Sequence, residues 1–334
     1  MMEENILEVK NLETSFFTHV GEVKAVRGVS FSVKKGEILG IVGESGSGKS
    51  VSLMSMMQLI EHPGKIKNGE VFFEGNDLLK KKEKEMLNVR GKEIAMIFQD
   101  PMSSLNPVYR IGNQIVESIL YHDKISKAEA RKRAVELLKM VGIPSAEERL
   151  NSYPHEFSGG MRQRVMIAMA LACHPKLLIA DEPTTALDVT IQLQILRLME
   201  EIQKKEGTTI ILVTHDLGVV AELCERVIVM YGGKIMEEGS VEDIFYNPKH
   251  PYTMGLLQSV PSVHNSKERL VPIPGSPPDL LNPPKGCPFC YRCSKARKIC
   301  TEMEPDFYQI SESQRCACWL QDPEVKAMLK DQPE

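Results

Sequence analysis

A glycine-rich octapeptide, GESGSGKS at residues 43–50, constrains the fold of this chain more than any other feature. It follows the apolar run at residues 38–42, which is typical of a buried strand, and precedes residues 51–60, which are typical of a helix. A strand and a helix joined by such a turn form a phosphate-binding loop, or P-loop. A glycine-rich turn with a chance Lys-Ser pair is the alternative, and the flanking elements favour the phosphate loop.

Each residue type in this loop suits a polyphosphate ligand. Glycines let the backbone turn tightly, so that N–H groups and the N-terminus of the following helix face the anion. Lys49 can reach the β- and γ-phosphates, and the Ser50 hydroxyl can bind Mg²⁺. The predicted nucleotide-binding residues of the loop are Gly43, Glu44, Ser45, Gly46, Ser47, Gly48, Lys49, Ser50 and Val51.

Length and charge restrict the class of protein. The chain has 334 residues, so we expect one large domain with an appendage. Its net charge of −4 lacks the excess of basic residues that is typical of nucleic-acid-binding proteins. No run approaches the roughly 18 apolar residues of a membrane span, and the first residues lack the pattern of a signal peptide. We therefore expect a soluble, cytoplasmic protein.

The order of elements predicts a parallel α/β core. Residues 1–35 alternate like antiparallel strands, and Ser126 with Glu129 forms a capping box that opens a helix over 126–142. Strand, helix and strand then follow at 177–180, 189–204 and 209–213. A hairpin is predicted around Gly232 and Gly233, and the compact unit is expected to end near residue 245. Residues 248–286 are so rich in proline that we expect an extended strap without regular helices.

An acidic pair ends the strand predicted at 177–180. Asp181 would hold the Mg²⁺ shell, as the aspartate at a strand end does in P-loop nucleotidases. Glu182 is then placed to orient or deprotonate the attacking water. Either acid alone could simply cap the following turn, but the combination with a P-loop favours the catalytic interpretation.

The run Phe157-Ser-Gly-Gly-Met-Arg-Gln-Arg164 resembles the signature sequence of the ATP-binding-cassette (ABC) family. The resemblance implies an α/β fold with a RecA-like parallel core, an antiparallel β subdomain and a helical subdomain over about residues 100–173, all within residues 1–245. Residues 246–334 would then form a small proline- and cysteine-rich C-terminal region. The signature residues that the resemblance assigns to the nucleotide are Ser158, Gly159, Gly160 and Gln163.

Other family positions follow from the same resemblance. Gln99 is similar to the glutamine that contacts Mg²⁺ and water, and His215 to the switch histidine at the γ-phosphate. Asp188 ends a loop that resembles the one joining two ATPase subunits. Phe16, with Phe17 beside it, resembles the aromatic residue that stacks on adenine. The family uses the signature helix on ATP held by a second ATPase subunit, so ATP is expected to join two subunits and hydrolysis to separate them.

Four further stretches make the resemblance specific to one group within the family. The runs at 99–107, 250–257, 272–278 and 286–289 are similar to those of ATPase subunits of dipeptide, oligopeptide and nickel importers. This resemblance implies two membrane permeases, a second and related ATPase, and an extracytoplasmic binding protein as partners, with the chain at the cytoplasmic face of the membrane. Peptide is the expected cargo, with nickel or another small solute as the alternative.

Six of the eight cysteines lie after residue 286, which in a reducing compartment favours a metal site over disulfides. From spacing alone, Cys287, Cys290 and Cys293 resemble part of a ferredoxin motif. The family resemblance instead implies a [4Fe–4S] cluster on Cys287, Cys293, Cys300 and Cys318. A zinc site and unmetallated buried thiols are the alternatives.

The nucleotide motifs also occur in two classes of function other than transport. A cassette ATPase of DNA repair or translation would use the tail as a nucleic-acid-binding zinc module, but such proteins usually carry two cassettes, a long coiled coil or basic arms. A metal-responsive regulator that only binds ATP would have an inactive site, whereas Lys49, Asp181, Glu182 and His215 are all present. The sequence shows none of those additions and keeps the site residues, so a transport ATPase is favoured.

Overall fold

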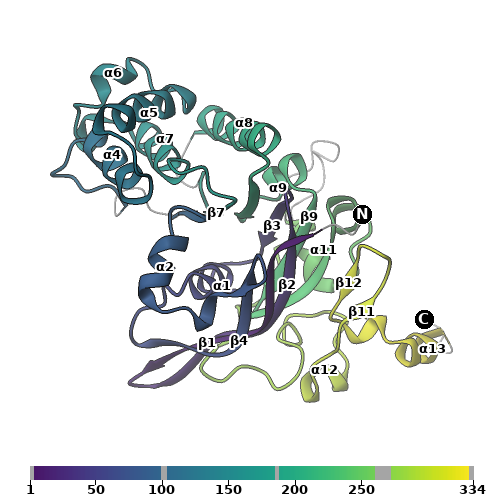
Figure 1. Cartoon of the computed structure of the whole chain (residues 1–334). Coiled ribbons are helices and arrows are strands. Elements are labelled where there is room, and N and C mark those ends of the chain that lie inside the picture. The colour runs from purple at the N-terminus through teal and green to yellow at the C-terminus, as the bar shows by residue number, and fades with distance from the viewer. Residues whose placement is uncertain (1–3, 99–103, 185–187, 260–271, 331–334) are drawn as a thin grey trace. The chain divides into compact units, whose positions relative to one another are not determined.

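A computed structural model of the chain describes residues 4–98, 104–184, 188–259 and 272–330. The chain forms two compact units. The first unit contains Val33–Ile38 and Lys80–Val213, together with the residues up to Ile6. The second unit contains Leu7–Ser32, Leu39–Leu79 and the chain from Thr214 onward. Figure 1 labels the helices and strands of the chain.

A three-stranded parallel sheet forms the core of the first unit. Its strands are β6 (Ile94–Ile97), β7 (Leu177–Asp181) and β8 (Thr209–Val213), with Leu177 opposite Ile94 on one side and Thr209 on the other. All residues of β7 and β8 are buried, which explains why these segments are continuous apolar runs. Helix α8 (Val189–Glu206) connects β7 to β8, as the strand–helix–strand pattern predicts.

Helices make up the rest of the first unit. Its other helical segments are α2 (Glu83–Val89), α4 (Ile111–His122), α5 (Lys127–Met140), α6 (Ala146–Arg149), the 3₁₀ turn η2 (Pro154–Glu156) and α7 (Gly159–Ala170). Figure 1 shows α4, α5, α6 and α7 as one cluster. The capping box of α5 is present as predicted, because Ser126 accepts from the N–H of Glu129 while the Glu129 side chain accepts from that of Ser126.

An antiparallel sheet opens the second unit, and its strand order is β2, β1, β4, β5. The strands are β1 (Asn5–Thr18), β2 (Gly21–Lys34), β4 (Gly64–Phe73) and β5 (Asn76–Asp77), followed by the 3₁₀ turn η1 (Leu78–Lys80). The side-chain oxygens of Thr14 on β1 and Ser55 on helix α1 (Lys49–Met56) lie 2.7 Å apart. This buried contact joins the sheet to the helix that follows the P-loop.

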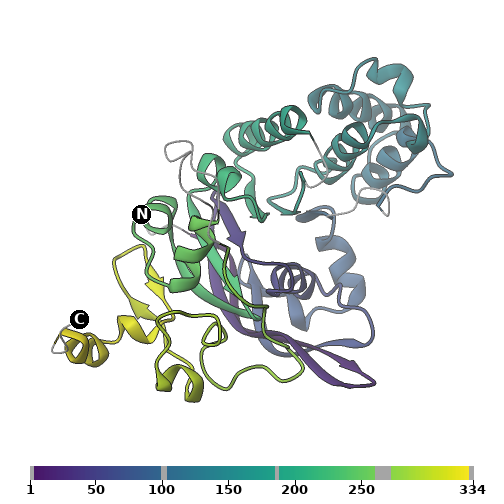
Figure 2. The same ribbon diagram turned by 180° about the vertical axis from the view of Figure 1, so that it is seen from behind.

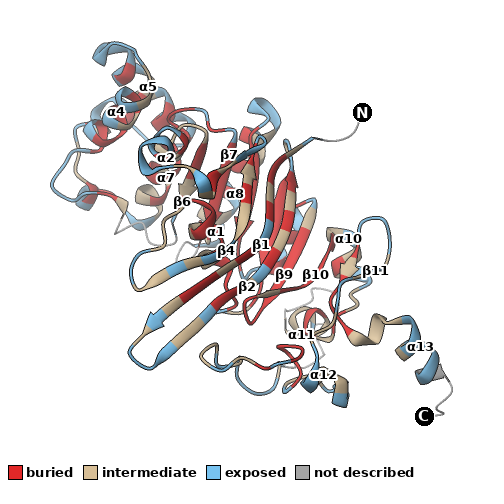
Figure 3. Cartoon of the chain, turned by 60° about the horizontal axis from the view of Figure 1, so that its bottom comes forward, coloured by how far each residue is buried: buried red, intermediate tan, exposed pale blue. Residues whose placement is uncertain are grey.

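The second unit also contains the strand that leads into the P-loop. This strand, β3 (Ile38–Val42), pairs in parallel with β9 (Arg226–Tyr231), and β9 pairs antiparallel with β10 (Lys234–Ser240). Helix α9 (Leu217–Leu223) precedes β9. Gly232 and Gly233 both have positive φ, which makes the tight turn of the predicted hairpin possible. Figure 3 shows β9 and β10 as mostly buried.

The chain beyond β10 packs on the second unit. Its elements are α10 (Val241–Tyr246), α11 (Pro251–Gln258), α12 (Lys298–Glu302), β11 (Tyr308–Gln309), β12 (Arg315–Cys316), the 3₁₀ turn η3 (Trp319–Gln321) and α13 (Pro323–Lys330). Strand β12 pairs with β10, and β11 with β12. The extended segment before α12 runs beside β2, where the N–H of Lys24 donates to the carbonyl of Leu280 (Figure 2).

Two expectations about helices are wrong in part. Helix α11 lies inside the proline-rich segment, because Pro251 occupies its first turn, where the missing N–H has no partner to lose. Helix α1 ends at Met56 rather than near residue 60, and Gln58 then adopts a φ of +51° that the helix cannot continue. Among the described residues, no helix is long and apolar enough to cross a membrane.

Candidate nucleotide-binding site

The P-loop connects β3 to α1 in a conformation that requires glycine. Gly43 has φ +154°, and a Cβ on it would lie 2.1 Å from the carbonyl oxygen of Met230 on β9. Gly48 caps α1 with φ +99°, and a Cβ there would lie 2.6 Å from the carbonyl oxygen of Ala25. The loop therefore lies directly against the neighbouring backbone, and its N–H groups lead into a helix N-terminus, as an anion site requires.

Lys49 is held inside this loop. Its side chain is buried, and Nζ donates to the carbonyl oxygens of Gly43 at 2.7 Å and Glu44 at 3.0 Å. The N–H of Ser47 also donates to the carbonyl of Glu44, and the N–H of Gly233 donates to the carbonyl of Ser47. The ammonium group is thus fixed among the residues whose backbone would surround the phosphates, which fits the predicted role in binding a nucleotide.

A backbone hydrogen bond places His215 near β3. The N–H of Thr214 donates to the carbonyl of Ile41 on β3, so His215 leaves the sheet beside the strand that enters the P-loop. Its side chain is exposed, whereas the next residue, Asp216, caps α9 through the N–H groups of Gly218 and Val219. His215 therefore directly follows a residue that is hydrogen-bonded to the strand entering the P-loop.

Asp181 and Glu182 end β7 in the first unit, as predicted. Asp181 is buried with 5% of its surface exposed, and Glu182 is partly exposed. The N–H of Glu182 donates to the carbonyl of Val213, and its φ of +49° lies in the left-handed region. A residue other than glycine in this region is strained, and such strain is concentrated at functional sites. No property of the sequence indicated this strain.

The signature residues begin helix α7. Ser158 is its N-cap and accepts from the N–H of Met161, while Gly159 and Gly160 supply the first turn. Ser158 and Gly159 are exposed, and a Cβ on Gly159 would meet no atom within 4 Å. Gln163 is different, because it is buried with 2% of its surface exposed. The first turn of α7 can therefore receive an anion, whereas the Gln163 side chain points into the protein.

Three other predicted residues have different surroundings. Asp188 is the N-cap of α8 and accepts from the N–H of Ile191 at 3.0 Å. Phe16 is partly buried and lies against Gly64, while Phe17 has 47% of its surface exposed. Gln99 lies outside the described residues, as do residues 185–187 of the loop before Asp188.

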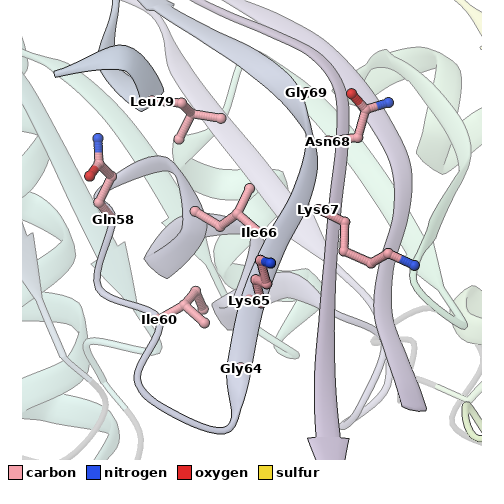
Figure 4. Close-up of a pocket in the computed structure, with 9 residues that line it drawn as sticks. All are labelled: Gln58, Ile60, Gly64, Lys65, Ile66, Lys67, Asn68, Gly69 and Leu79. Carbon is pink, nitrogen blue, oxygen red and sulfur yellow. The ribbon is translucent and has the colours of Figure 1, made fainter.

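A pocket of about 460 Å³ also lies in the second unit, but it is separate from the P-loop. It follows the C-terminal end of α1 and is lined by Gln58, Ile60, Leu79 and the first half of β4 (Figure 4). None of the predicted site residues lines it. The nucleotide site is therefore identified by backbone geometry and not by this pocket.

The prediction of a metal centre in the tail is wrong. Among the described residues, no group of three or more His, Cys, Asp or Glu side chains could hold a metal ion. The expected ligands Cys287, Cys293, Cys300 and Cys318 are free thiols. Burial raises the pKa of the Cys287 and Cys318 thiols to about 12. Neither the [4Fe–4S] cluster nor the zinc alternative is supported.

Comparisons with known proteins agree with the geometry of the loop and of α7. Residues 26–185 match the family described as ABC transporter, and residues 236–300 match the oligopeptide/dipeptide transporter C-terminal region. The oligopeptide transport ATP-binding protein OppD of Bacillus subtilis is 61% identical over 96% of this chain and 90% of its own length. This chain belongs to the ABC transporter family. It is accordingly an ABC ATPase that binds ATP and Mg²⁺.

Other relatives and solved structures support the same assignment. The dipeptide transport ATP-binding protein DppD of Lactococcus lactis is 56% identical over 97% of this chain and 93% of its own length. A dimeric ATP-binding cassette solved in a post-hydrolysis state with ADP and Pi has a TM-score of 0.65 and 31% identity, covering 70% of this chain and 98% of that one. The predicted fold class, an α/β ABC ATPase with a parallel sheet core, is confirmed.

Proposed function

We propose that this ABC ATPase powers the import of peptides. The observation that carries the proposal is the extent of similarity to OppD and DppD, which are named for oligopeptide and dipeptide transport and match the chain over both its cassette and its C-terminal region. A similarity limited to the cassette would support ATP hydrolysis alone. Nickel or another small solute is the alternative cargo, and no observation on the structure favours it.

The proposed assembly contains two membrane permeases, a second ATPase subunit and an extracytoplasmic binding protein. In this assembly the chain binds at the cytoplasmic face of the membrane and supplies ATP hydrolysis, while the other subunits select the cargo. We assign residues 1–245 to the cassette, with a helical subdomain at about 100–173, and residues 246–334 to a C-terminal region. The dimeric cassette with ADP and Pi supports a role for paired ATPase subunits in the cycle.

We assign roles at the site by chemistry. Lys49 and the P-loop N–H groups bind the β- and γ-phosphates, and the Ser50 hydroxyl, Gln99 and Asp181 are the expected Mg²⁺ ligands. Bound Mg²⁺ would neutralise charge on the phosphates. Glu182 orients or deprotonates the attacking water.

Other groups of the chain complete this proposed site. His215 contacts the γ-phosphate, and Phe16 stacks on the adenine. The exposed first turn of α7, with Ser158 and Gly160, binds the nucleotide held by the second ATPase subunit, because free N–H groups at a helix N-terminus favour an anion. ATP then holds two subunits together, and its hydrolysis weakens the interface.

Uptake measurements test this function. The chain is produced with its own permeases and binding protein in cells that lack their own peptide importer, and the uptake of radiolabelled dipeptides to pentapeptides and of radioactive nickel is followed. We expect uptake of peptides that is abolished by Lys49→Ala. A matched control is Lys205→Ala, which removes an exposed lysine paired with Glu201 on α8 and should leave uptake unchanged.

Three other results would contradict parts of the proposed function. Uptake of nickel without peptide would replace the proposed cargo by the alternative. Peptide uptake that survives Lys49→Ala would remove the P-loop from the mechanism. Binding of DNA or RNA that weakens steeply with salt would support the nucleic-acid class of function.

A further inference from the structure

The P-loop is in direct contact with the region beyond residue 245, at Glu44. The backbone N–H of Glu44 donates to the hydroxyl oxygen of Tyr252 on α11 at 2.8 Å. The carboxylate of Glu44 accepts from Nη1 of Arg292 at 2.6 Å. All three residues belong to the second unit. Two residues of the C-terminal region therefore hold one residue of the phosphate loop, one through its backbone and one through its side chain.

Arg292 is built into this position. Its side chain has 7% of its surface exposed, and its guanidinium also donates to the hydroxyl of Tyr231 at 3.0 Å and to the carbonyls of Pro274 at 2.7 Å and Ile273 at 3.2 Å. Burial lowers the pKa of Arg292, but the hydrogen bonds to Glu44 and Tyr231 outweigh it and raise the pKa above its usual value. The guanidinium is thus a fixed positive charge that links the proline-rich segment to the loop.

Tyr252 is equally constrained. Its side chain is fully buried, and its ring packs against Tyr231 and Phe289 with centroid distances of 4.5 Å and 5.3 Å. Burial raises the pKa of Tyr252, so the hydroxyl stays neutral and can accept the N–H of Glu44 without adding a negative charge beside the loop. The aromatic cluster fixes the hydroxyl, and the hydroxyl fixes the start of the loop.

Glu44 transmits these contacts to the lysine that binds phosphate. Its carbonyl oxygen accepts both from Nζ of Lys49 and from the N–H of Ser47. A movement of Glu44 would therefore displace the ammonium group and the turn of the loop together. An unpaired Glu44 carboxylate would also repel a polyanion, and the charge of Arg292 opposes this repulsion.

We propose that Tyr252 and Arg292 are positioning residues of the nucleotide site, so that the C-terminal region sets the affinity of the P-loop for ATP. This inference rests on the proposed role of the P-loop residues. A loop that is already held in its binding conformation loses less entropy when the ligand binds. Pairing Glu44 with Arg292 removes an electrostatic penalty against the phosphates. Residues distant in sequence from every nucleotide motif thus become part of the site.

The test measures the dissociation constants of Mg-ATP and Mg-ADP for the full-length chain by calorimetry, at low temperature and short times. We expect Arg292→Gln to weaken ATP binding about tenfold, the scale of a lost, partly buried charge pair near a ligand. The weakening should be greater for ATP than for ADP, because ATP carries more charge. Arg292→Lys should retain part of the affinity. The double variant Glu44→Gln/Arg292→Gln should recover part of it, because the unpaired carboxylate is gone.

Two further variants separate positioning from folding. Tyr252→Phe removes only the hydroxyl, keeps the aromatic cluster, and should weaken ATP binding by a smaller factor. Arg315→Gln is the matched control, because Arg315 is another arginine of the C-terminal region and pairs with Glu238 away from the loop. It should leave the affinity for ATP unchanged.

Three results would overturn the proposal. They are an unchanged ATP affinity in Arg292→Gln, an equal loss in Arg315→Gln, and no recovery in the double variant. If Arg292→Gln does not fold, Tyr252→Phe decides alone, and native affinity in that variant rejects the proposal. Lys49→Ala distinguishes the two levels of inference. Retained ATP binding in Lys49→Ala would refute the role of the P-loop itself. If Lys49→Ala loses ATP binding but Arg292→Gln binds ATP with native affinity, only the positioning role is refuted.

Discussion

The backbone of Glu182, the proposed general base, is in the left-handed region, as it is at five other described residues that are not glycine. It follows a strand that is completely buried, and its φ of +49° is unfavourable for a side chain other than glycine. Such a conformation costs on the order of 1 kcal/mol, and it persists only where the surroundings enforce it. Here β7 and the hydrogen bond to Val213 enforce it. The carboxylate is thus presented at a fixed place at the strand end.

Glu182→Gln should abolish turnover and retain ATP binding. The amide is close to the carboxylate in shape but cannot accept a proton from water, so we expect ATP hydrolysis in the assembled transporter to fall at least about 100-fold. ATP affinity of the isolated chain should remain, because the phosphate contacts are unchanged. Phosphate release and ATP binding are measured on the same preparation. Undiminished hydrolysis would show that another group activates the water.

At the scale of residues, the sequence shows which residue types form each motif and in what order, but not which distant residues contact each other. GESGSGKS and the pair Asp181 and Glu182 were found because each motif is continuous in the chain. Arg292 and Tyr252 lie more than 200 residues from Glu44, as given by the separations of 248 and 208, and no local pattern connects them. The metal site predicted in the tail is wrong because spacing along the chain does not show whether cysteine side chains gather as ligands, and no such group exists among the described residues.

Helix α11 is the element that holds Tyr252 against the P-loop, and its first residues depend on a buried histidine. His250 is the N-cap, and its Nδ1 accepts from the N–H of Tyr252 at 3.0 Å, so the neutral ring carries its proton on Nε2. The backbone N–H of His250 donates to the buried carboxylate of Glu237 on β10. A strand and a helix are thereby joined at one residue.

His250 should make the C-terminal region sensitive to acid. Burial lowers its pKa from 6.5 to about 3, so its contribution to stability is present above pH 6.5 and is lost as the pH falls toward 3. Between pH 7 and 5.5 the native chain should lose about 1 kcal/mol more stability than His250→Asn, which keeps a capping oxygen but does not titrate. Urea unfolding followed by the fluorescence of Trp319, the single tryptophan, measures the difference. Identical pH dependence in both proteins would contradict the assignment.

Strong local signals made most elements predictable. The residue limits of β3 and β8 agree with their apolar runs, and α5 begins where its capping box places it. The proline content of residues 248–286 does not predict α11, because a proline in the first helical turn leaves the helix intact. The early end of α1 depends on the backbone of Gln58, which periodicity does not reveal.

On the scale of the whole molecule, the proposed contact with the nucleotide of a second ATPase subunit is helix α7. Its first turn is exposed, its N-cap serine is satisfied within the helix, and Gly159 leaves space above it. An anion can therefore approach this turn from solvent. We therefore expect a change at the start of α7 to affect ATP hydrolysis without affecting ATP binding by the isolated chain.

Ser158→Arg should block hydrolysis in the assembled transporter while the isolated chain binds ATP as before. A large side chain at the start of α7 would fill the space that the second subunit's nucleotide needs, and we expect turnover to fall on the order of 100-fold, as when a stabilising donor is removed. Ser158→Ala removes the hydroxyl and the cap, worth about 1 kcal/mol of helix stability, but leaves the space open, so it should reduce turnover less than Ser158→Arg. Weakened ATP binding in the isolated Ser158→Arg chain would place α7 at its own nucleotide instead.

The short ladder of β10, β12 and β11 has a consequence for engineering. Glu237 and Glu238 of β10 are paired with Cys316 and Arg315, so the tail covers backbone groups at the outer side of a strand. An uncovered strand edge is a template for pairing with another chain. A cassette shortened to its first 245 residues would expose that edge and would be prone to aggregation during expression. We therefore expect residues 246–334 also to protect the solubility of the ATPase that they follow.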